Sequence, residues 1–181
     1  MNRNFNQESK ATPRRPQTRS LVMASLLAAI CFGATLVSIP LPTGYGNLGD
    51  CLVILSGWIL GPVWGAVAAG MGTALADVAL GFGVYAPATF VIKWAMATLG
   101  WFFARVLGRR CQRRGTKLLL CIAAAAVAEI IMIGGYFVYE CLLWGVASAA
   151  GALLGNSMQA IVGLVLSSAL MILFTQRTEK K

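Results

Sequence analysis

The chain has 181 residues, of which 58% are hydrophobic and only 12% charged. A soluble domain is nearer about 45–50% apolar and about 25% charged, so this composition excludes an ordinary water-soluble fold and indicates a membrane protein. The net charge of +9 is gathered in residues 3–19, 105–117 and 177–181, with Lys93 apart from them, which indicates basic loops and tails and argues against a nucleic-acid-binding surface.

The N-terminal segment divides into a polar tail and an apolar run. Residues 1–19 are basic and predict a disordered tail, and residues 20–39 form the first apolar run, which stops at Pro40. This run is longer than the roughly 7–15 apolar residues of a signal peptide core, and no small-x-small cleavage site follows it. It therefore predicts a retained membrane span.

The rest of the chain reads as five further spans. Residues 40–50 are too rich in proline and glycine for a regular helix, and the apolar run 51–84 is too long for one span. Gly61-Pro62 breaks it, because proline cannot donate a helical hydrogen bond and suits a first turn. The expected helices are a short one over 51–61 and longer ones over 62–81, 87–107, 118–139 and 148–174, with residues 175–181 as a second tail.

Charge gives this arrangement an orientation. Basic loops stay in the cytoplasm, and only a true break at Gly61 puts an even number of spans between residues 3–19 and 105–117. We therefore predict an all-α membrane protein, a bundle of six transmembrane helices over residues 20–174 in the cell membrane, with both termini cytoplasmic. The basic clusters serve as topology determinants in this interpretation, in preference to binding lipid headgroups or RNA.

Small residues recur at four-residue spacing on three of the predicted helices. The rows are Gly61, Gly65, Ala69, Thr73, Asp77 and Gly81 on the third helix, and Gly151, Gly155, Gln159, Gly163 and Ser167 on the sixth. Such rows let helix backbones approach closely in a bilayer. The first helix carries Ala24-x-x-x-Ala28, which serves equally well for packing within the chain or against a partner helix.

Charged residues inside predicted spans are the first candidates for function, because each costs about 2.5–3.5 kcal/mol at a helix centre. Asp77 and Lys93 flank one short turn, so either an ion pair between them or direct ligand contacts would explain both. On the fifth helix Glu129, Tyr136 and Glu140 fall on one face. Asn156 and Gln159 reach the same outer region, which predicts a polar pocket open to the outside. Aromatic residues lie at its rim, where an interfacial belt is favoured over stacking on a ligand; they are Tyr45, Tyr85, Tyr139 and Trp144.

Several catalytic and cofactor motifs are excluded. Gly44-Tyr-Gly-Asn-Leu-Gly49 matches G-x-G-x-x-G, but no predicted strand precedes it, so a loop that covers a site is the better interpretation. The chain has no P-loop motif, no histidine, and five cysteines without a C-x-x-C pair. We therefore predict no metal, no cofactor and no enzymatic activity.

The chain resembles the substrate-binding S components of energy-coupling factor (ECF) vitamin transporters over about residues 20–174. The resemblance rests on Ala24-x-x-x-Ala28, Gly44-Tyr-Gly-Asn-Leu-Gly-Asp50, Ala76-Asp77 and Tyr85-Ala-Pro-Ala-Thr-Phe-Val-Ile-Lys93. It implies that the chain captures a vitamin from outside, while a membrane coupling (T) protein and two ATPase subunits supply the energy. It also implies that Ala24 and Ala28 face the coupling protein and that the loop 43–50 covers the ligand.

The ligand implied by the resemblance is riboflavin, hydroxymethylpyrimidine, pyridoxine or a related nitrogen heterocycle. The substrate-binding residues that we expect are Tyr45, Asn47, Asp50, Asp77, Tyr85, Lys93, Glu129, Tyr136, Glu140, Asn156 and Gln159. The competing hypothesis is a stand-alone channel or proton-coupled permease that uses Asp77, Glu129 and Glu140 as a proton relay. A structural protein without a ligand would leave these carboxylates unexplained.

Overall fold

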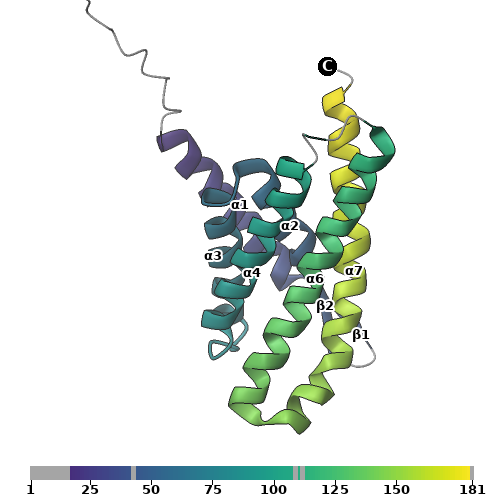
Figure 1. Cartoon of the computed structure of the whole chain (residues 1–181). Coiled ribbons are helices and arrows are strands. Elements are labelled where there is room, and N and C mark those ends of the chain that lie inside the picture. The colour runs from purple at the N-terminus through teal and green to yellow at the C-terminus, as the bar shows by residue number, and fades with distance from the viewer. Residues whose placement is uncertain (1–16, 42–43, 108–109, 111–112, 180–181) are drawn as a thin grey trace, which may run out of the picture.

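The protein folds as a helical bundle with one short β-hairpin (Figure 1). The computed structural model describes residues 17–41, 44–107, 110 and 113–179. In this described part the elements are α1 (Gln17–Leu36), β1 (Ser38–Leu41), β2 (Gly44–Asn47), α2 (Gly49–Leu60), α3 (Trp64–Ala79), α4 (Ala86–Trp101), a π-helical continuation of it (Phe102–Leu107), α6 (Arg114–Trp144) and α7 (Val146–Glu179).

The predicted all-helical bundle is confirmed, with helix ends that differ by a few residues. The break at Gly61 is real: its φ of 90° lies in the left-handed region that favours glycine, and Pro62 follows in the turn before α3. The fifth predicted helix is longer than expected, because it continues past residue 139 to Trp144 and ends at Gly145, which has φ 83°.

The segment 40–50, predicted as an irregular loop, contains most of a β-hairpin, whose first strand begins at Ser38, within the residues expected to end the first span. β1 pairs antiparallel with β2, with Ser38 opposite Asn47 and Pro40 opposite Tyr45. A two-stranded sheet has only edge strands, where a proline that cannot donate a hydrogen bond is tolerated. The richness in proline and glycine therefore excluded a helix but not a strand.

Chain direction supports an even number of crossings. The start of α1, the α2–α3 turn and the end of α7 lie at one end of the bundle, and the α3–α4 and α6–α7 turns lie at the other (Figure 1). Among the described helices α1, α6 and α7 are long and apolar enough to cross a membrane, while α2 is a shorter apolar helix of 12 residues. The fold is consistent with six spans, and the cytoplasmic position of the termini stays a prediction.

Helix α2 occupies the middle of the bundle. It contacts α1, α3, α4 and α7, while α6 packs between α4 and α7. These contacts are close because glycine stands at the crossings: a Cβ on Gly57 would overlap the Ala97 carbonyl of α4, and a Cβ on Gly65 would overlap the Ser56 carbonyl of α2. The glycine row on α3 therefore packs within the chain.

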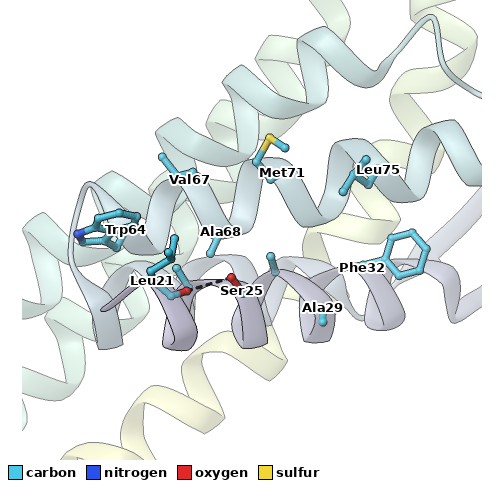
Figure 2. Close-up of a pocket in the computed structure, with 11 residues that line it drawn as sticks. Leu21, Ser25, Ala29, Phe32, Trp64, Val67, Ala68, Met71 and Leu75 are labelled. Atoms are coloured by element: carbon cyan, nitrogen blue, oxygen red, sulfur yellow. Dashed lines mark hydrogen bonds between the residues drawn. The ribbon is translucent and has the colours of Figure 1, made fainter. Parts of the chain in front are cut away.

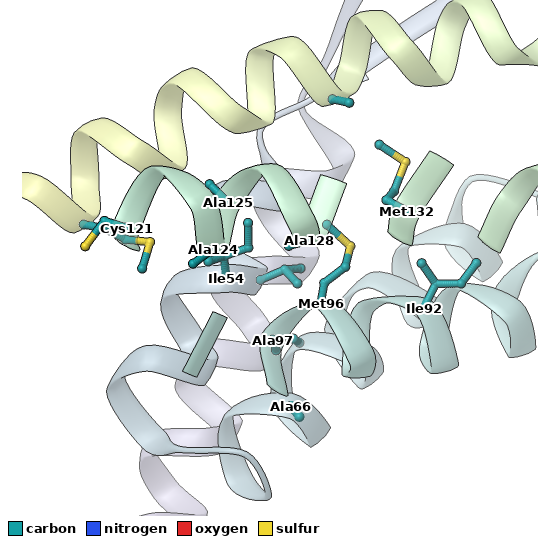
Figure 3. Packing of buried hydrophobic residues seen from close by; sticks show 14 residues of the cluster. Ile54, Ala66, Ile92, Met96, Ala97, Cys121, Ala124, Ala125, Ala128 and Met132 are labelled. Atoms are coloured by element: carbon teal, nitrogen blue, oxygen red, sulfur yellow. The ribbon is translucent and has the colours of Figure 1, made fainter. Parts of the chain in front are cut away.

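The apolar core lies between α2, α4 and α6 (Figure 3). Alanines of α6 supply much of it and let this helix approach its neighbours, while Met96 and Met132 fill the remaining space as flexible side chains. At the hairpin side this core borders a set of buried polar residues, which form the candidate site.

Candidate functional site: a buried polar cluster and an apolar groove

Asp50 is the centre of a buried polar cluster. It lies in the first turn of α2, fully buried, where the positive end of the helix dipole favours a carboxylate. Lys93 of α4 forms an ion pair with its Oδ1, and Gln159 of α7 donates a hydrogen bond from Nε2 to its Oδ2 at 2.7 Å. Both oxygens of Asp50 are therefore satisfied by residues from two other helices.

The ion pair expected between Asp77 and Lys93, one of the two alternatives drawn from the sequence, is not formed. Lys93 is bound to Asp50, 43 residues away in the chain, and not to Asp77 across the short turn. Lys93 is only 2% exposed, and a charge at that depth takes the partner that is equally buried. Asp77 is half-buried beside Thr89, and its Oδ2 has no hydrogen-bond partner within the described part of the chain.

Tyr136 of α6 extends the cluster toward Asp77. Its hydroxyl lies 2.8 Å from the Thr89 hydroxyl of α4, and its ring lies under Lys93, with 5.6 Å between Nζ and the ring centroid. At that distance the ring attracts the ammonium group through a cation–π interaction. The structure thus brings Asp50, Lys93, Tyr136 and Gln159 together, as expected for members of one site.

Glu129 lies in the same region but without partners. Its side chain is 3% exposed, and neither carboxyl oxygen has a hydrogen-bond partner among the described residues. The carboxyl lies against Gly163 of α7, where an added Cβ would overlap Oε1 and would come within 3.2 Å of the Asp50 Cβ. Glu129 is therefore a buried carboxyl group next to an ion pair that it does not join.

Aromatic residues connect the α3–α4 turn to the C-terminal end of α6. The Tyr139 hydroxyl donates to the Val84 carbonyl at 2.6 Å, and the Tyr85 and Tyr139 rings stack edge to face with centroids 5.9 Å apart. Tyr85 interacts with Glu140, and burial raises the pKa of the Tyr85 hydroxyl above its ordinary value. These contacts tie the α3–α4 turn to the end of α6.

The remaining predicted residues lie at the edges of this region. Asn156 is half-buried on α7, one turn before Gln159, and Glu140 is buried with Oε2 unpartnered among the described residues. Tyr45 and Asn47 belong to β2, which packs against α7, and their side chains lie outside the described part of the structure. Thr89 was not predicted as a site residue, because only its position beside Asp77 and Tyr136 in the folded chain indicates that it belongs to the site.

A second feature is an open groove between α1 and α3 (Figure 2). We call it the α1–α3 groove; it has a volume of about 530 Å³ and is lined by Leu21, Ala24, Ser25, Ala28, Ala29 and Phe32 of α1 and Trp64, Val67, Ala68, Met71 and Leu75 of α3. Ala24 is buried against Ala68 and also lines the groove. The alanine strip therefore serves packing within the chain and still leaves an open apolar surface.

Comparison with known proteins places this arrangement in a family. A family model described as "ECF-type riboflavin transporter, S component" matches residues 15–176. A solved structure titled "Structure and mechanism of the S component of a bacterial ECF transporter" superposes with a TM-score of 0.61 at 23% identity, covering 91% of this chain and 97% of that one. An uncharacterised protein in the gap 3′ region of Pyrococcus woesei is 30% identical over 152 residues, which are 82% of this chain and 96% of that protein. The chain therefore belongs to the family of ECF-type riboflavin transporter S components, the substrate-binding membrane subunits of ECF transporters.

Proposed function

We propose that this chain captures a vitamin-like nitrogen heterocycle from outside the cell and delivers it to a coupling module made of a membrane T protein and two ATPase subunits. The observation that carries the proposal is the separation of the two features. The polar cluster is enclosed by α2, α4, α6 and α7, whereas the open apolar surface belongs to α1 and α3. One side is built to hold a polar ligand and the other to meet a membrane partner.

The polar cluster supports the ligand half of the proposal. A carboxylate, an ammonium group, an amide and a phenol within membrane helices cost free energy, so each is a candidate for a function. The hairpin ends at Asn47, shortly before Asp50 in the chain, and β2 packs on α7, which supports a role for the hairpin as a cover over the cluster. We propose that movement of this hairpin admits the ligand.

The α1–α3 groove supports the partner half. Helices associate in a bilayer through small residues that allow close approach, because apolar burial gains little against lipid. Ala24, Ser25, Ala28 and Ala29 provide such a surface on α1, and the larger side chains of α3 form the opposite wall. We propose a helix of the coupling protein as the occupant of this groove.

Substitution of Ala29 tests the groove directly. Ala29 is exposed and lines the groove, so Ala29→Trp should fill it and lower uptake at least about fivefold in cells that contain the coupling proteins, as expected for a central interface position. Ligand binding by the purified variant should be unchanged. The matched control is Leu26→Trp, because Leu26 is 56% exposed on α1 but does not line the groove. Equal uptake by the two variants would refute the partner surface.

The ligand is proposed to be riboflavin, hydroxymethylpyrimidine or pyridoxine, or a close relative. Riboflavin is the compound in the description of the matching family. Mass spectrometry of small molecules that copurify with the detergent-solubilised protein would identify it. Recovery of none of these compounds, together with no binding of any of them to the purified protein, would refute the ligand assignment.

A proton-coupled permease is the second candidate function. Asp77, Glu129 and Glu140 each have a buried carboxyl oxygen without a hydrogen-bond partner among the described residues, as groups of a proton relay would. The two functions predict opposite responses to removal of the coupling proteins.

A further inference from the structure

The buried cluster contains more acids than cations. Lys93 is the only Lys or Arg between residues 20 and 104, and residues 118–176 contain none. Lys93 is bound to Asp50, and Gln159 satisfies the second oxygen of that carboxylate. Glu129 therefore has no described cation of its own.

This imbalance decides the charge of Glu129. A second ionised carboxylate beside Asp50 would leave an unpaired charge within the bundle, at a cost of about 2.5–3.5 kcal/mol or more in a membrane span. The described groups near Glu129 are Asp50 and Cys51 from α2, Lys93 from α4 and Gly163 from α7, and Lys93 is the one cation among them. The cost of an unpaired charge therefore favours the neutral form of Glu129 while the Asp50–Lys93 pair is formed.

A neutral carboxyl group differs from a carboxylate in what it can bind. It presents one hydrogen-bond donor and one acceptor side by side, as a primary amide does, whereas a carboxylate presents acceptors only. Both oxygens of Glu129 lack partners among the described residues, and a buried group left unsatisfied costs about 1–3 kcal/mol. A ligand with the complementary edge would remove that cost.

We infer that Glu129, as a neutral acid seated on Gly163, selects ligands that carry an N–H or NH₂ donor next to an acceptor, such as a cyclic imide, a lactam or an aminopyrimidine. This inference rests on the proposed function and narrows its substrate class. Riboflavin carries such an edge on its pyrimidinedione ring, and hydroxymethylpyrimidine carries it on its aminopyrimidine ring. Pyridoxine, a pyridine with hydroxyl groups, has no such edge.

Gly163 is the positioning residue of this arrangement. The Glu129 carboxyl occupies the space that a side chain at position 163 would need, so Gly163→Ala displaces the acid without changing any charge or polar group. Gly151 lies on the same helix, and an added Cβ there meets nothing within 4 Å. Gly151→Ala is therefore a matched control for the same chemical change.

The first experiment measures binding of riboflavin to purified protein in detergent through quenching of its fluorescence. Glu129→Gln keeps the donor and acceptor and should bind within about threefold of the wild type, while Glu129→Leu removes both and should bind at least about tenfold more weakly. Gly163→Ala should weaken binding at least about fivefold, and Gly151→Ala should not change it. If Glu129→Gln weakens riboflavin binding as much as Glu129→Leu, or if Glu129→Leu binds riboflavin like the wild type, the inference is wrong.

The ligand panel separates this inference from the proposed function. The wild type should bind riboflavin or hydroxymethylpyrimidine and lose at least about tenfold in affinity for riboflavin methylated at its imide nitrogen. Binding of pyridoxine alone would overturn the inference and leave the proposed function standing. Binding of none of the three would overturn both.

The protonation state has its own readout that needs no ligand. The infrared spectrum of the ligand-free wild type should contain the C=O stretch of a protonated carboxyl group that disappears in Glu129→Gln. Absence of this difference band would show that Glu129 is ionised and would contradict the inference.

Discussion

At the scale of single residues, the defining feature is the buried Asp50–Lys93 ion pair with the carboxyl group of Glu129 beside it. Asp50 is held by Lys93 and Gln159, and Glu129 stands beside them unpaired among the described residues. Removing one member of a buried pair leaves a charge that nothing compensates, which costs about 3–5 kcal/mol, whereas removing both costs less.

A double-mutant cycle tests this pair. Lys93→Met and Asp50→Asn should each lower the thermal stability of the detergent-solubilised protein, by about 3–5 kcal/mol for Lys93→Met because Asp50 is left without its cation. The double variant should be more stable than Lys93→Met alone. Additive losses would show that the two residues act independently and would contradict the pairing.

The sequence predicted these residues as candidates but not their partners. Depth within an apolar run identified Lys93 and Glu129, because charge in a span is costly wherever it occurs. The pairing of Lys93 with Asp50 depends on how α2 and α4 lie in space, whereas the sequence suggested the nearer Asp77 as the ion-pair partner. The lack of partners for Glu129 is visible only in three dimensions.

At the scale of elements, the packing of α3 against α2 depends on close contact between their backbones. Gly65 lies where α3 crosses α2, and its carbonyl accepts a hydrogen bond from the Ser56 hydroxyl at 2.8 Å. Gly65→Ala should destabilise the protein by about 1–3 kcal/mol, as overpacking does, measured by thermal unfolding in detergent. Gly134→Ala on the exposed face of α6 meets nothing within 4 Å and should be neutral or stabilising by up to about 1 kcal/mol. Equal effects would show that the crossing is looser than described.

The turn between α3 and α4 depends on Tyr139. Tyr139→Phe removes the hydrogen bond to the Val84 carbonyl, which contributes about 1 kcal/mol. Amide hydrogen exchange of residues 80–85 should become several-fold faster in this variant, while exchange in the α2–α3 turn should stay as in the wild type. Unchanged exchange at 80–85 would show that the edge-to-face contact of Tyr85 with Tyr139 suffices to hold the turn.

Helix number and order could be predicted because span length, proline breaks and basic loops are local signals. The β-hairpin could not, since Pro40 and the glycines of residues 44–49 are common to irregular loops and to short edge strands. The alanine strip of α1 gave two alternatives, and the structure shows why: Ala24 both packs on Ala68 and lines the open groove.

At the scale of the whole molecule, orientation follows from the basic loops and can be measured. Gly83 lies in the α3–α4 turn and Gly115 at the start of α6, and these two segments are at opposite ends of the bundle (Figure 1). Both glycines are exposed, and an added side chain meets nothing within 4 Å at either. In a variant with the five native cysteines replaced by alanine, a membrane-impermeant thiol reagent should label Gly83→Cys in intact cells. It should label Gly115→Cys only after the cells are permeabilised. The reverse pattern would invert the orientation.

The division of labour between this chain and a coupling module is the central claim, and uptake of a labelled ligand in cells tests it most directly. Radiolabelled riboflavin, or the compound that copurifies with the protein, should accumulate only when the T protein and both ATPases are present with this chain. Accumulation should depend on ATP and survive collapse of the proton gradient. Uptake by this chain alone that disappears with an uncoupler would contradict the account and establish a proton-coupled permease.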